Sequence, residues 1–132
     1  TFLRREEAAR SKLTAYFWRR KKNNLGSRLG LQIYAGTCAR GLHIWHYGSV
    51  IISGDAVVGE NCTFHGQACI GSDGASDEAP VLGKNLDIGA GAKIIGAVTL
   101  ADNIRVGAGA VVVKSCETPG ATLVGVPARQ VE

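Results

Sequence analysis

The stretch VLGKNLDIGAGAKIIGAVTLADNIRVGAGAVVV, residues 81–113, repeats with a period of six residues. Every sixth position carries a large apolar residue, and the same phase can be followed back along the chain to Ile52. The positions two residues earlier are mostly small or aliphatic. The series of large residues runs Ile52, Val58, Phe64, Ile70, Ser76, Leu82, Ile88, Ile94, Leu100, Val106 and Val112, in which Ser76 is the one polar member.

A strict period of six predicts short strands, because a helix with 3.6 residues per turn cannot keep such a series on one face. Alternate residues of a strand share a face, so the large position and the position two before it both point inward. Gly and Asn tolerate the left-handed backbone that a corner needs. They recur one or three residues after the large position, at Gly59, Asn61, Gly71, Gly83, Asn85, Gly89, Gly91, Asn103, Gly107 and Gly109.

Three hexads of this kind close one triangular coil, and a coil buries its inner face only when the next coil stacks on it. The repeat therefore predicts an all-β repeat fold, a parallel β-helix of hexapeptide repeats, for which we expect left-handed coils. An antiparallel barrel fits poorly, because hairpins rarely keep one phase over sixty residues.

Two segments interrupt the repeat. Residues 72–80, SDGASDEAP, keep its spacing but lose the apolar phase, which predicts a loop pushed out of the coil. The phase also blurs between Ile33 and Trp45, so we expect altered corners in the first coil. Residues 2–22 favour a helix. The predicted organisation is a basic N-terminal helical arm at 1–31, the β-helix domain at 32–118 and a C-terminal tail at 119–132.

Charge is distributed unevenly along the 132 residues. Residues 1–30 carry nine basic and two acidic residues, a net charge of +7, and the remainder carries six and nine, a net charge of −3, which sum to +4. A solvated helix explains such an arm, and contact with anionic lipid headgroups or a polyanionic acceptor is the alternative. No nucleic-acid-binding motif accompanies the charge. Without a secretory signal or a long apolar run, the chain is expected to be cytoplasmic.

The four cysteines show neither a CxxC motif nor the Cys/His spacing of a metal site. Cys62 and Cys116 fall on the inward phase of the repeat, so we expect them to be small apolar fillers in a reducing compartment. Cys38 and Cys69 are assigned no role.

Four segments resemble the serine acetyltransferase-like branch of the hexapeptide-repeat acyltransferases, and the similarity covers about residues 33–131. Within the branch, the chain is most similar to enzymes that O-acetylate cell-surface polysaccharides or their precursors. The resemblance implies acetyl-CoA as co-substrate and a homotrimer with active sites in clefts between subunits. The segments are GLHIWHYGSVII at 41–52, VVGENCTFHGQACIG at 57–71, APVLGKNLDIGAGAKIIG at 79–96 and GVPAR at 125–129.

The resemblance implies that His46 is the general base, because it matches the family's catalytic histidine. A positioned imidazole can take the proton of an alcohol as the oxygen attacks a thioester. The alternative is a corner histidine that packs against Trp45. His65 follows Phe64, so it is expected on a corner where it can meet the acceptor substrate or simply face solvent.

We predict that the protein binds no metal. His43, the third histidine, is assigned no role. The three histidines are spaced by 3 and 19 residues, which differs from the pattern of carbonic-anhydrase-like hexapeptide proteins.

Coenzyme A binding in this family is carried mainly by the backbone, and it is expected here at positions that match the family. Small residues there allow close approach, although corners also need small residues for their own sake. Two cationic residues are candidates for the phosphates of coenzyme A. The predicted set is Gly71, Ala90, Ala108, Lys114 and Arg129.

Departures from the serine acetyltransferase pattern bear on the acceptor. Ala79 stands where those enzymes have a second histidine, and Gln32 lies near the place of the aspartate that partners their catalytic histidine. Asp77 matches an aspartate of their loop and is predicted to contact the acceptor. We therefore predict acetyl transfer to a hydroxyl of a sugar or surface-polysaccharide unit. Serine O-acetylation for cysteine biosynthesis and a non-catalytic scaffold are the alternatives.

Overall fold

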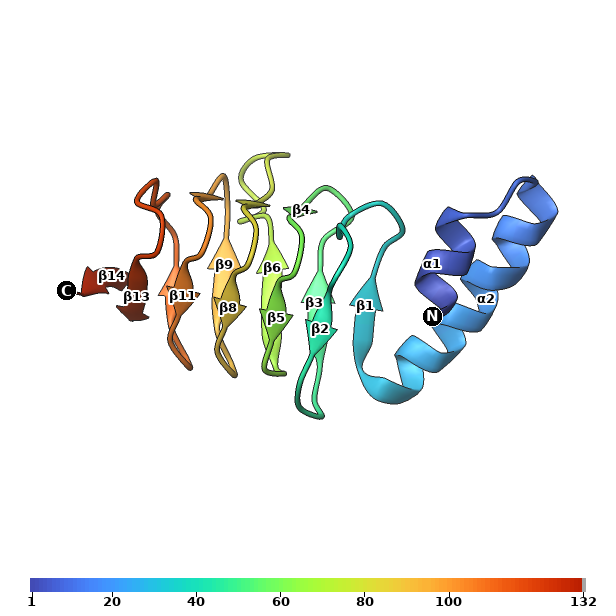
Figure 1. The fold of residues 1–132 in the computed structure, drawn as a ribbon, viewed down its shortest axis with the longest axis horizontal. Coiled ribbons are helices and arrows are strands. Elements are labelled where there is room, and N and C mark those ends of the chain that lie inside the picture. Colours follow the sequence, from blue (N-terminus) through green and yellow to red (C-terminus); the bar gives the residue numbers. More distant parts are fainter. Residues whose placement is uncertain (132) are drawn as a thin grey trace.

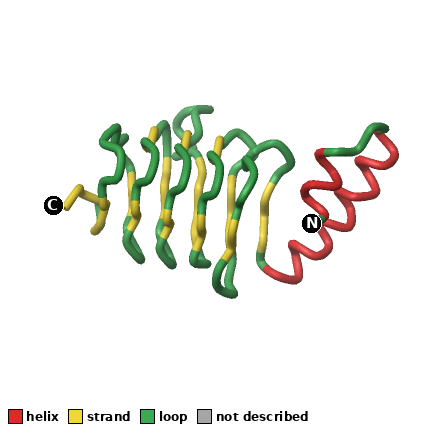
Figure 2. Tube along the Cα trace, in the orientation of Figure 1, coloured by secondary structure: helices red, strands yellow, loops and turns green. Residues whose placement is uncertain are grey.

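The computed structural model describes residues 1–131, which form a helix pair followed by a three-sided parallel β-helix (Figure 1). The coils stack along the long axis of the molecule, from the helices at one end to the C-terminus at the other (Figure 1). Short strands alternate with turns throughout the coils, and helix is confined to the N-terminal part (Figure 2).

Three sheets form the three sides of the β-helix. Sheet A contains β1 (Leu31–Ile33), β3 (Val50–Ile52), β6 (Ala68–Gly71), β9 (Lys93–Ile95) and β12 (Val111–Val112). Sheet B contains β4 (Val57–Val58), β7 (Val81–Leu82) and β10 (Thr99–Leu100). Sheet C contains β2 (His43–Ile44), β5 (Thr63–Phe64), β8 (Asp87–Ile88), β11 (Arg105–Val106), β13 (Thr122–Gly125) and β14 (Ala128–Val131).

The strand register confirms that three hexads make one coil. Among the strands from Val81 to Val112, paired residues lie 18 positions apart, as in the pair Val81↔Thr99. Across residues 72–80 the separation rises to 24, as in Thr63↔Asp87, so this segment adds one hexad that is looped out of the coil. The structure therefore confirms the predicted parallel β-helix and its interruption.

The predicted inward positions form the core. Nearly all of these positions are buried, both the large residue of a hexad and the residue two before it. Phe64 is the largest fully buried side chain of the core. The exceptions, Gly74 and Ser76, are exposed and belong to the looped-out segment. Each fully buried aliphatic or aromatic side chain contributes about 1.5–3 kcal/mol of burial free energy. The low aromatic content is thus compatible with a continuous, thin core.

The corners use Gly and Asn for two different reasons. The Asn and Gly residues predicted at the corners three after the large position have φ between 56° and 73°: Asn61, Asn85, Gly91, Asn103 and Gly109. The glycines directly after the large position lack a positive φ. A Cβ at Gly59 would lie 2.3 Å from the carbonyl oxygen of Gly83, and one at Gly89 would lie 2.5 Å from the Ala108 nitrogen. Gly59 and Gly89 are therefore needed where stacked coils touch.

The N-terminal arm is a helical hairpin and not one continuous helix. Helix α1 (Phe2–Glu7) and helix α2 (Lys12–Leu29) are separated by a break at residues 8–11. Ser11 caps α2, since its hydroxyl accepts a hydrogen bond from the Thr14 amide. Helix α2 ends at Gly30, whose φ of 71° is left-handed. The expected helix at 2–22 is thus broken by a cap and extended to Leu29.

Ion pairs join the two helices of this hairpin, and hydrogen bonds to backbone carbonyls fasten it to the first coil. The buried carboxylate of Glu6 pairs with Arg19 at 2.7 Å and with Lys22 at 3.0 Å. Burial raises the pKa of Glu6, but hydrogen bonds from these two cations outweigh it and leave the pKa below its ordinary value. Lys22 also donates to the Ile33 carbonyl at 2.9 Å, and Arg4 donates to the Cys38 carbonyl at 2.8 Å.

The last segment of the chain still belongs to the β-helix. Strand β13 pairs in parallel with β11, and β14 folds back antiparallel on β13. The four cysteines are free thiols. Cys38 and Cys62 are buried, and burial raises the pKa of both thiols, whereas Cys116 is half-buried. No helix within residues 1–131 has the length and apolar character needed to cross a membrane.

Candidate functional site

The corner between β2 and β3, residues 45–49, is longer than its counterparts between sheets C and A. Counted between the last inward residue of sheet C and the first inward residue of sheet A, it contains five residues, whereas the later corners at 65–67, 89–91 and 107–109 contain three. We call it the long corner. Its extra residues explain why His43 pairs with Thr63, 20 positions later, and why the repeat blurs there.

The long corner presents large side chains to solvent. Trp45 is 61% exposed and Tyr47 is fully exposed, and His46 between them is exposed as well. Gly66 lets this corner lie on the next one, because a Cβ at Gly66 would be 2.9 Å from the Tyr47 carbonyl oxygen. His46 lies six residues before Ile52, so the repeat alone would place it inward. In the structure Ile44 takes that inward position, since it pairs with the buried Phe64.

His46 lies next to the other predicted histidine of the site. Its ring centroid is 5.6 Å from that of His65, and Trp45 lies 6.5 Å from His46 and 6.3 Å from His65. His43 contacts Trp45 edge-on at 5.0 Å. The structure therefore brings His46 and His65 together, with an exposed indole beside both rings.

His65 is bonded to a carboxylate that sequence reasoning missed. Its Nε2 lies 2.6 Å from Oδ1 of Asp87, and the other oxygen of Asp87 lies 3.9 Å from Nε of Arg105. The side chain of His65 is 29% exposed and that of Asp87 is 47% exposed. A count of 24 residues for the coil with the loop would have placed Asp87 beside Thr63 on the outer face of sheet C, close to His65.

Sheet C builds this arrangement because its inward and outward residues alternate. Phe64, Ile88 and Val106 are buried, so the residues beside them face outward. The outward residues pair in the order His43, Thr63, Asp87, Arg105 and Thr122, which places charged and polar side chains in one column. The site thus follows from the register of sheet C.

The predicted coenzyme A residues lie at three different places. Ala90 and Ala108 occupy equivalent, exposed positions on successive corners between sheets C and A. Gly71 ends β6, and Lys114 follows β12, so both lie at the other end of sheet A. Arg129 is on β14 and is exposed. An added Cβ at Gly71 meets no atom within 4 Å, so packing alone does not require glycine there.

The looped-out segment lies at the far end of β6 from His65. Asp77 is exposed there, and Asp73 organises the loop by accepting hydrogen bonds from the amides of Ala75 and Ser76. These hydrogen bonds lower the pKa of Asp73. Four residues of strand β6 separate the loop from His65, a span of about 13 Å. A single chain therefore does not bring Asp77 to the histidines.

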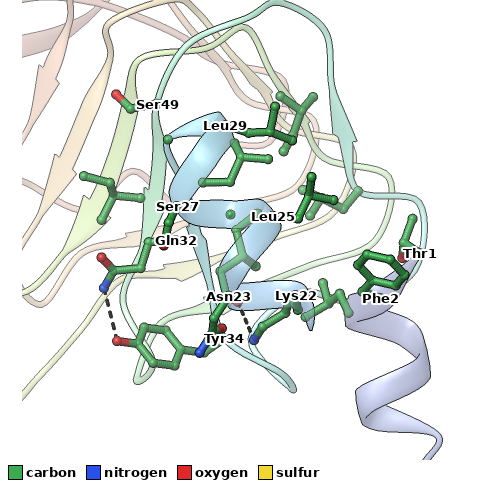
Figure 3. A pocket seen from close by; sticks show the side chains of 18 of the residues that line it. Thr1, Phe2, Lys22, Asn23, Leu25, Ser27, Leu29, Gln32, Tyr34 and Ser49 are labelled. Atoms are coloured by element: carbon green, nitrogen blue, oxygen red, sulfur yellow. Dashed lines mark hydrogen bonds between the residues drawn. The ribbon is translucent and has the colours of Figure 1, made fainter. Parts of the chain in front are cut away.

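Gln32, at the place expected for a partner of His46, has another contact. It lies on β1 and donates from Nε2 to the Tyr34 hydroxyl at 3.1 Å (Figure 3). Both residues line a cavity of about 1010 Å³ between α2 and the first coil, where Leu25 and Leu29 project from the helix (Figure 3). No histidine lines this cavity.

Metal binding finds no support in the side-chain arrangement of residues 1–131. No three His, Cys, Asp or Glu side chains within that range converge in a way that could hold a metal ion. The chemistry available at the long corner is that of imidazole and carboxylate groups, which take up, hold and release protons.

Comparisons with known proteins identify similar structures. No family model matches the sequence, and no curated protein matches it. The serine acetyltransferase of Neisseria gonorrhoeae in complex with serine is 32% identical, with a TM-score of 0.74, over 89% of this chain and 48% of that chain. The serine acetyltransferase of Brucella abortus in complex with coenzyme A is 27% identical, with a TM-score of 0.81, over 98% and 53%. The soybean apoenzyme is 28% identical, with a TM-score of 0.77, over 89% and 50%.

This chain spans about half the length of those structures. The similarities confirm the resemblance to the serine acetyltransferase-like branch of the hexapeptide-repeat acyltransferases. They extend over the helix pair as well as the coils in the Brucella abortus structure, which covers 98% of the chain.

Proposed function

We propose that this chain is part of an O-acetyltransferase that moves an acetyl group from acetyl-CoA to a hydroxyl of a small acceptor. The observation that carries the proposal is the long corner, which places the ring centroid of His46 5.6 Å from that of His65, the histidine bonded to Asp87. The similar Brucella abortus structure is a complex with coenzyme A, which supports acetyl-CoA as the donor.

His46 acts as general base in this proposal. The acceptor oxygen forms a bond to the thioester carbon as its proton moves to the imidazole. The bond between that carbon and sulfur then breaks, and the proton passes to the departing thiolate, which leaves as the free thiol of CoA. A positioned imidazole contributes about 10²–10⁴-fold to such a reaction. No covalent enzyme intermediate is required.

Acetyl-CoA is proposed to lie along the corners between sheets C and A and to extend past the end of sheet A. Ala90 and Ala108 leave room for the pantetheine arm on successive corners, and Gly71 leaves room beyond β6. Lys114 and Arg129 are exposed cations suited to phosphates. Because these residues lie at three places, we propose that two subunits share one donor site.

The acceptor is proposed to be L-serine or a sugar hydroxyl. The similar structures are serine acetyltransferases, one of them in complex with serine, and this supports serine at least as well as a sugar. A sugar or surface-polysaccharide unit is supported by the exposed Trp45, whose indole gives an apolar face beside His46. Ala79 and Gln32 also depart from the charged set that an amino acid would engage.

The assembly is proposed to be a homotrimer with left-handed coils. Within one chain the loop at 72–80 leaves sheet A at the end opposite His65. A neighbouring copy would bring its own loop, with Asp77, against the long corner. The site is then complete only between subunits.

The basic arm is proposed to reach anionic lipid headgroups. Both of its carboxylates, Glu6 and Glu7, are paired within the hairpin, which leaves several cations of α2 free to act outward. Leu13 and Phe17 are exposed on the same helix and would enter the interface. A cytoplasmic location is proposed, where acetyl-CoA is available and the four thiols stay reduced.

The proposal is tested by chromatographic detection of CoA released from acetyl-CoA. The acceptors are L-serine, a panel of sugars, nucleotide sugars and oligosaccharides, and none. Acceptor-dependent release that falls about 10²–10⁴-fold in His46→Ala supports the proposal. His43→Ala, a nearby histidine with no assigned role, is the matched control.

Release with serine alone assigns the chain to serine acetylation, and release with a glycan alone assigns it to sugar acetylation. No release with any acceptor and no saturable acetyl-CoA binding would overturn the enzyme proposal. A non-catalytic scaffold is then the function that remains.

A further inference from the structure

We propose that Asp87 is a positioning residue that acts through His65 on His46, so that the three side chains form one hydrogen-bonded chain, which we call the relay. This inference rests on the proposed function, because it explains how His46 is prepared to take the acceptor's proton. Asp87 lies on β8 and His65 follows β5, so neighbouring coils of sheet C supply the two ends of the first link.

The first link fixes the tautomer of His65. An ionised carboxylate only accepts hydrogen bonds, so the Nε2 that lies 2.6 Å from Asp87 must carry a proton. In the neutral ring the other nitrogen, Nδ1, then holds the free lone pair. His65 is thereby prepared as a hydrogen-bond acceptor at Nδ1.

The second link fixes the tautomer of His46. With ring centroids 5.6 Å apart, the two imidazoles are in reach of a hydrogen bond, either direct or through one water. An N–H of His46 directed at His65 leaves the other nitrogen of His46 unprotonated. That nitrogen is the one that meets the acceptor hydroxyl on the exposed side of the long corner.

The charges around the relay favour transfer of the acceptor's proton to His46. The groups that face it are His43, which contacts Trp45, the Asp87 carboxylate, and Arg105, whose Nε lies 3.9 Å from Asp87. When His46 takes a proton, its positive charge develops near the Asp87–His65 pair, which carries one negative charge. Arg105 is 72% exposed, so water screens much of its opposing charge.

In the relay, Asp87 provides the carboxylate partner for a histidine that no residue of the first coil provides. Gln32 stands near the place of the expected aspartate, and its amide bonds to Tyr34. A histidine–carboxylate unit is still formed, but its carboxylate comes from the second coil beyond His46 along sheet C. During transfer the proton moves from the acceptor hydroxyl to His46, and His46 then gives it to the thiolate sulfur of the departing CoA.

The test compares Asp87→Asn, Asp87→Glu and the double variant His46→Ala/Asp87→Asn in the CoA-release reaction. Asparagine keeps an oxygen that accepts from Nε2 but removes the charge. We expect kcat to fall about tenfold to hundredfold in Asp87→Asn with an unchanged KM for acetyl-CoA. The acidic limb of the kcat/KM profile is expected to move to lower pH, because the imidazolium loses a stabilising charge. Asp87→Glu should recover part of the rate.

Three outcomes separate the relay from a structural role. Asp87→Asn should add nothing to the loss in His46→Ala, since both act on one proton transfer. Glu117→Gln, the loss of an exposed charge on the last coil, should leave the profile unchanged. If the wild type is active and Asp87→Asn leaves both its rate and its pH profile unchanged, the relay is overturned but the proposed function is not. If the wild type itself is inactive, the proposed function is overturned.

Discussion

The corners at 45–49 and 89–91 occupy equivalent places between sheets C and A but differ in length and in residues. The later corner, Gly-Ala-Gly, is short, and a Cβ at Gly89 would press on the backbone of the next coil. The long corner holds Trp-His-Tyr-Gly-Ser and exposes its side chains. The short corner therefore serves stacking, and the long corner has room for functional side chains because it does not have to follow the repeat.

Replacing residues 45–49 by Gly-Ala-Gly is the strongest test of this difference. The β-helix should persist, because the new corner matches those that already join sheets C and A. Acetyl transfer should fall by at least about 10²-fold, since the base is removed. Circular dichroism and CoA release measure the two properties. Loss of folding together with activity would contradict the view that the long corner is dispensable for stacking.

Ile94→Ala tests the opposite property in a regular coil. Ile94 is fully buried on β9, so we expect unfolding to be easier by about 2–5 kcal/mol. Denaturant titration measures this loss. Val113→Ala is the control, because Val113 is 49% exposed and its truncation should change stability by less than about 0.5 kcal/mol. Equal losses of stability in the two variants would show that Ile94 contributes no more to the core than the exposed Val113.

Gly89→Ala and Gly71→Ala compare two glycines that each follow a large apolar residue. The first places a methyl group 2.5 Å from the Ala108 nitrogen and should cost about 1–3 kcal/mol. The second meets nothing within 4 Å and should leave thermal stability unchanged. If Gly71 borders the donor, as predicted, Gly71→Ala should still raise the KM for acetyl-CoA. A stable Gly89→Ala variant would contradict close stacking at the short corner.

Glu6→Gln probes the helix pair, where ion pairs and not stacked strands hold α1 to α2. Because the pKa of Glu6 is lowered on folding, its contribution is complete above its ordinary value of 4.5 and is lost as the pH falls through the lower folded value. The variant should be about 1–2 kcal/mol less stable at pH 7 and less sensitive to acid. Thermal unfolding at pH 7 and pH 3.5 measures both. An unchanged pH dependence would show that the ion pairs of Glu6 do not stabilise the packing of α1 on α2.

Sequence reasoning reached the core because burial in a β-helix repeats. Each coil presents the same inward positions, so Ile88, Ile94 and Leu100 could be placed without knowing any contact. The αL corners were predictable for a related reason, since Asn85 and Asn103 are residues that tolerate a positive φ. The glycines at 59, 83 and 89 were recognised, but their purpose was not, because close approach between coils is not a local property.

The site was predictable only in part. His46 and His65 were found because their residue type and segment match a known branch. Asp87 was missed, since its place beside His65 depends on a hexad being looped out between them. Arg105 was missed as well, because it joins the column only through the register of sheet C.

The sequence by itself determined the period, the inward face and the corners, because these depend on residue type at fixed spacing. Only the tertiary structure decided which outward side chains meet. His65 and Asp87 are 22 residues apart, and they come together because stacking converts a separation along the chain into a position on a neighbouring coil. The fold of this chain is therefore determined by local sequence, whereas its proposed chemistry depends on side chains from different coils.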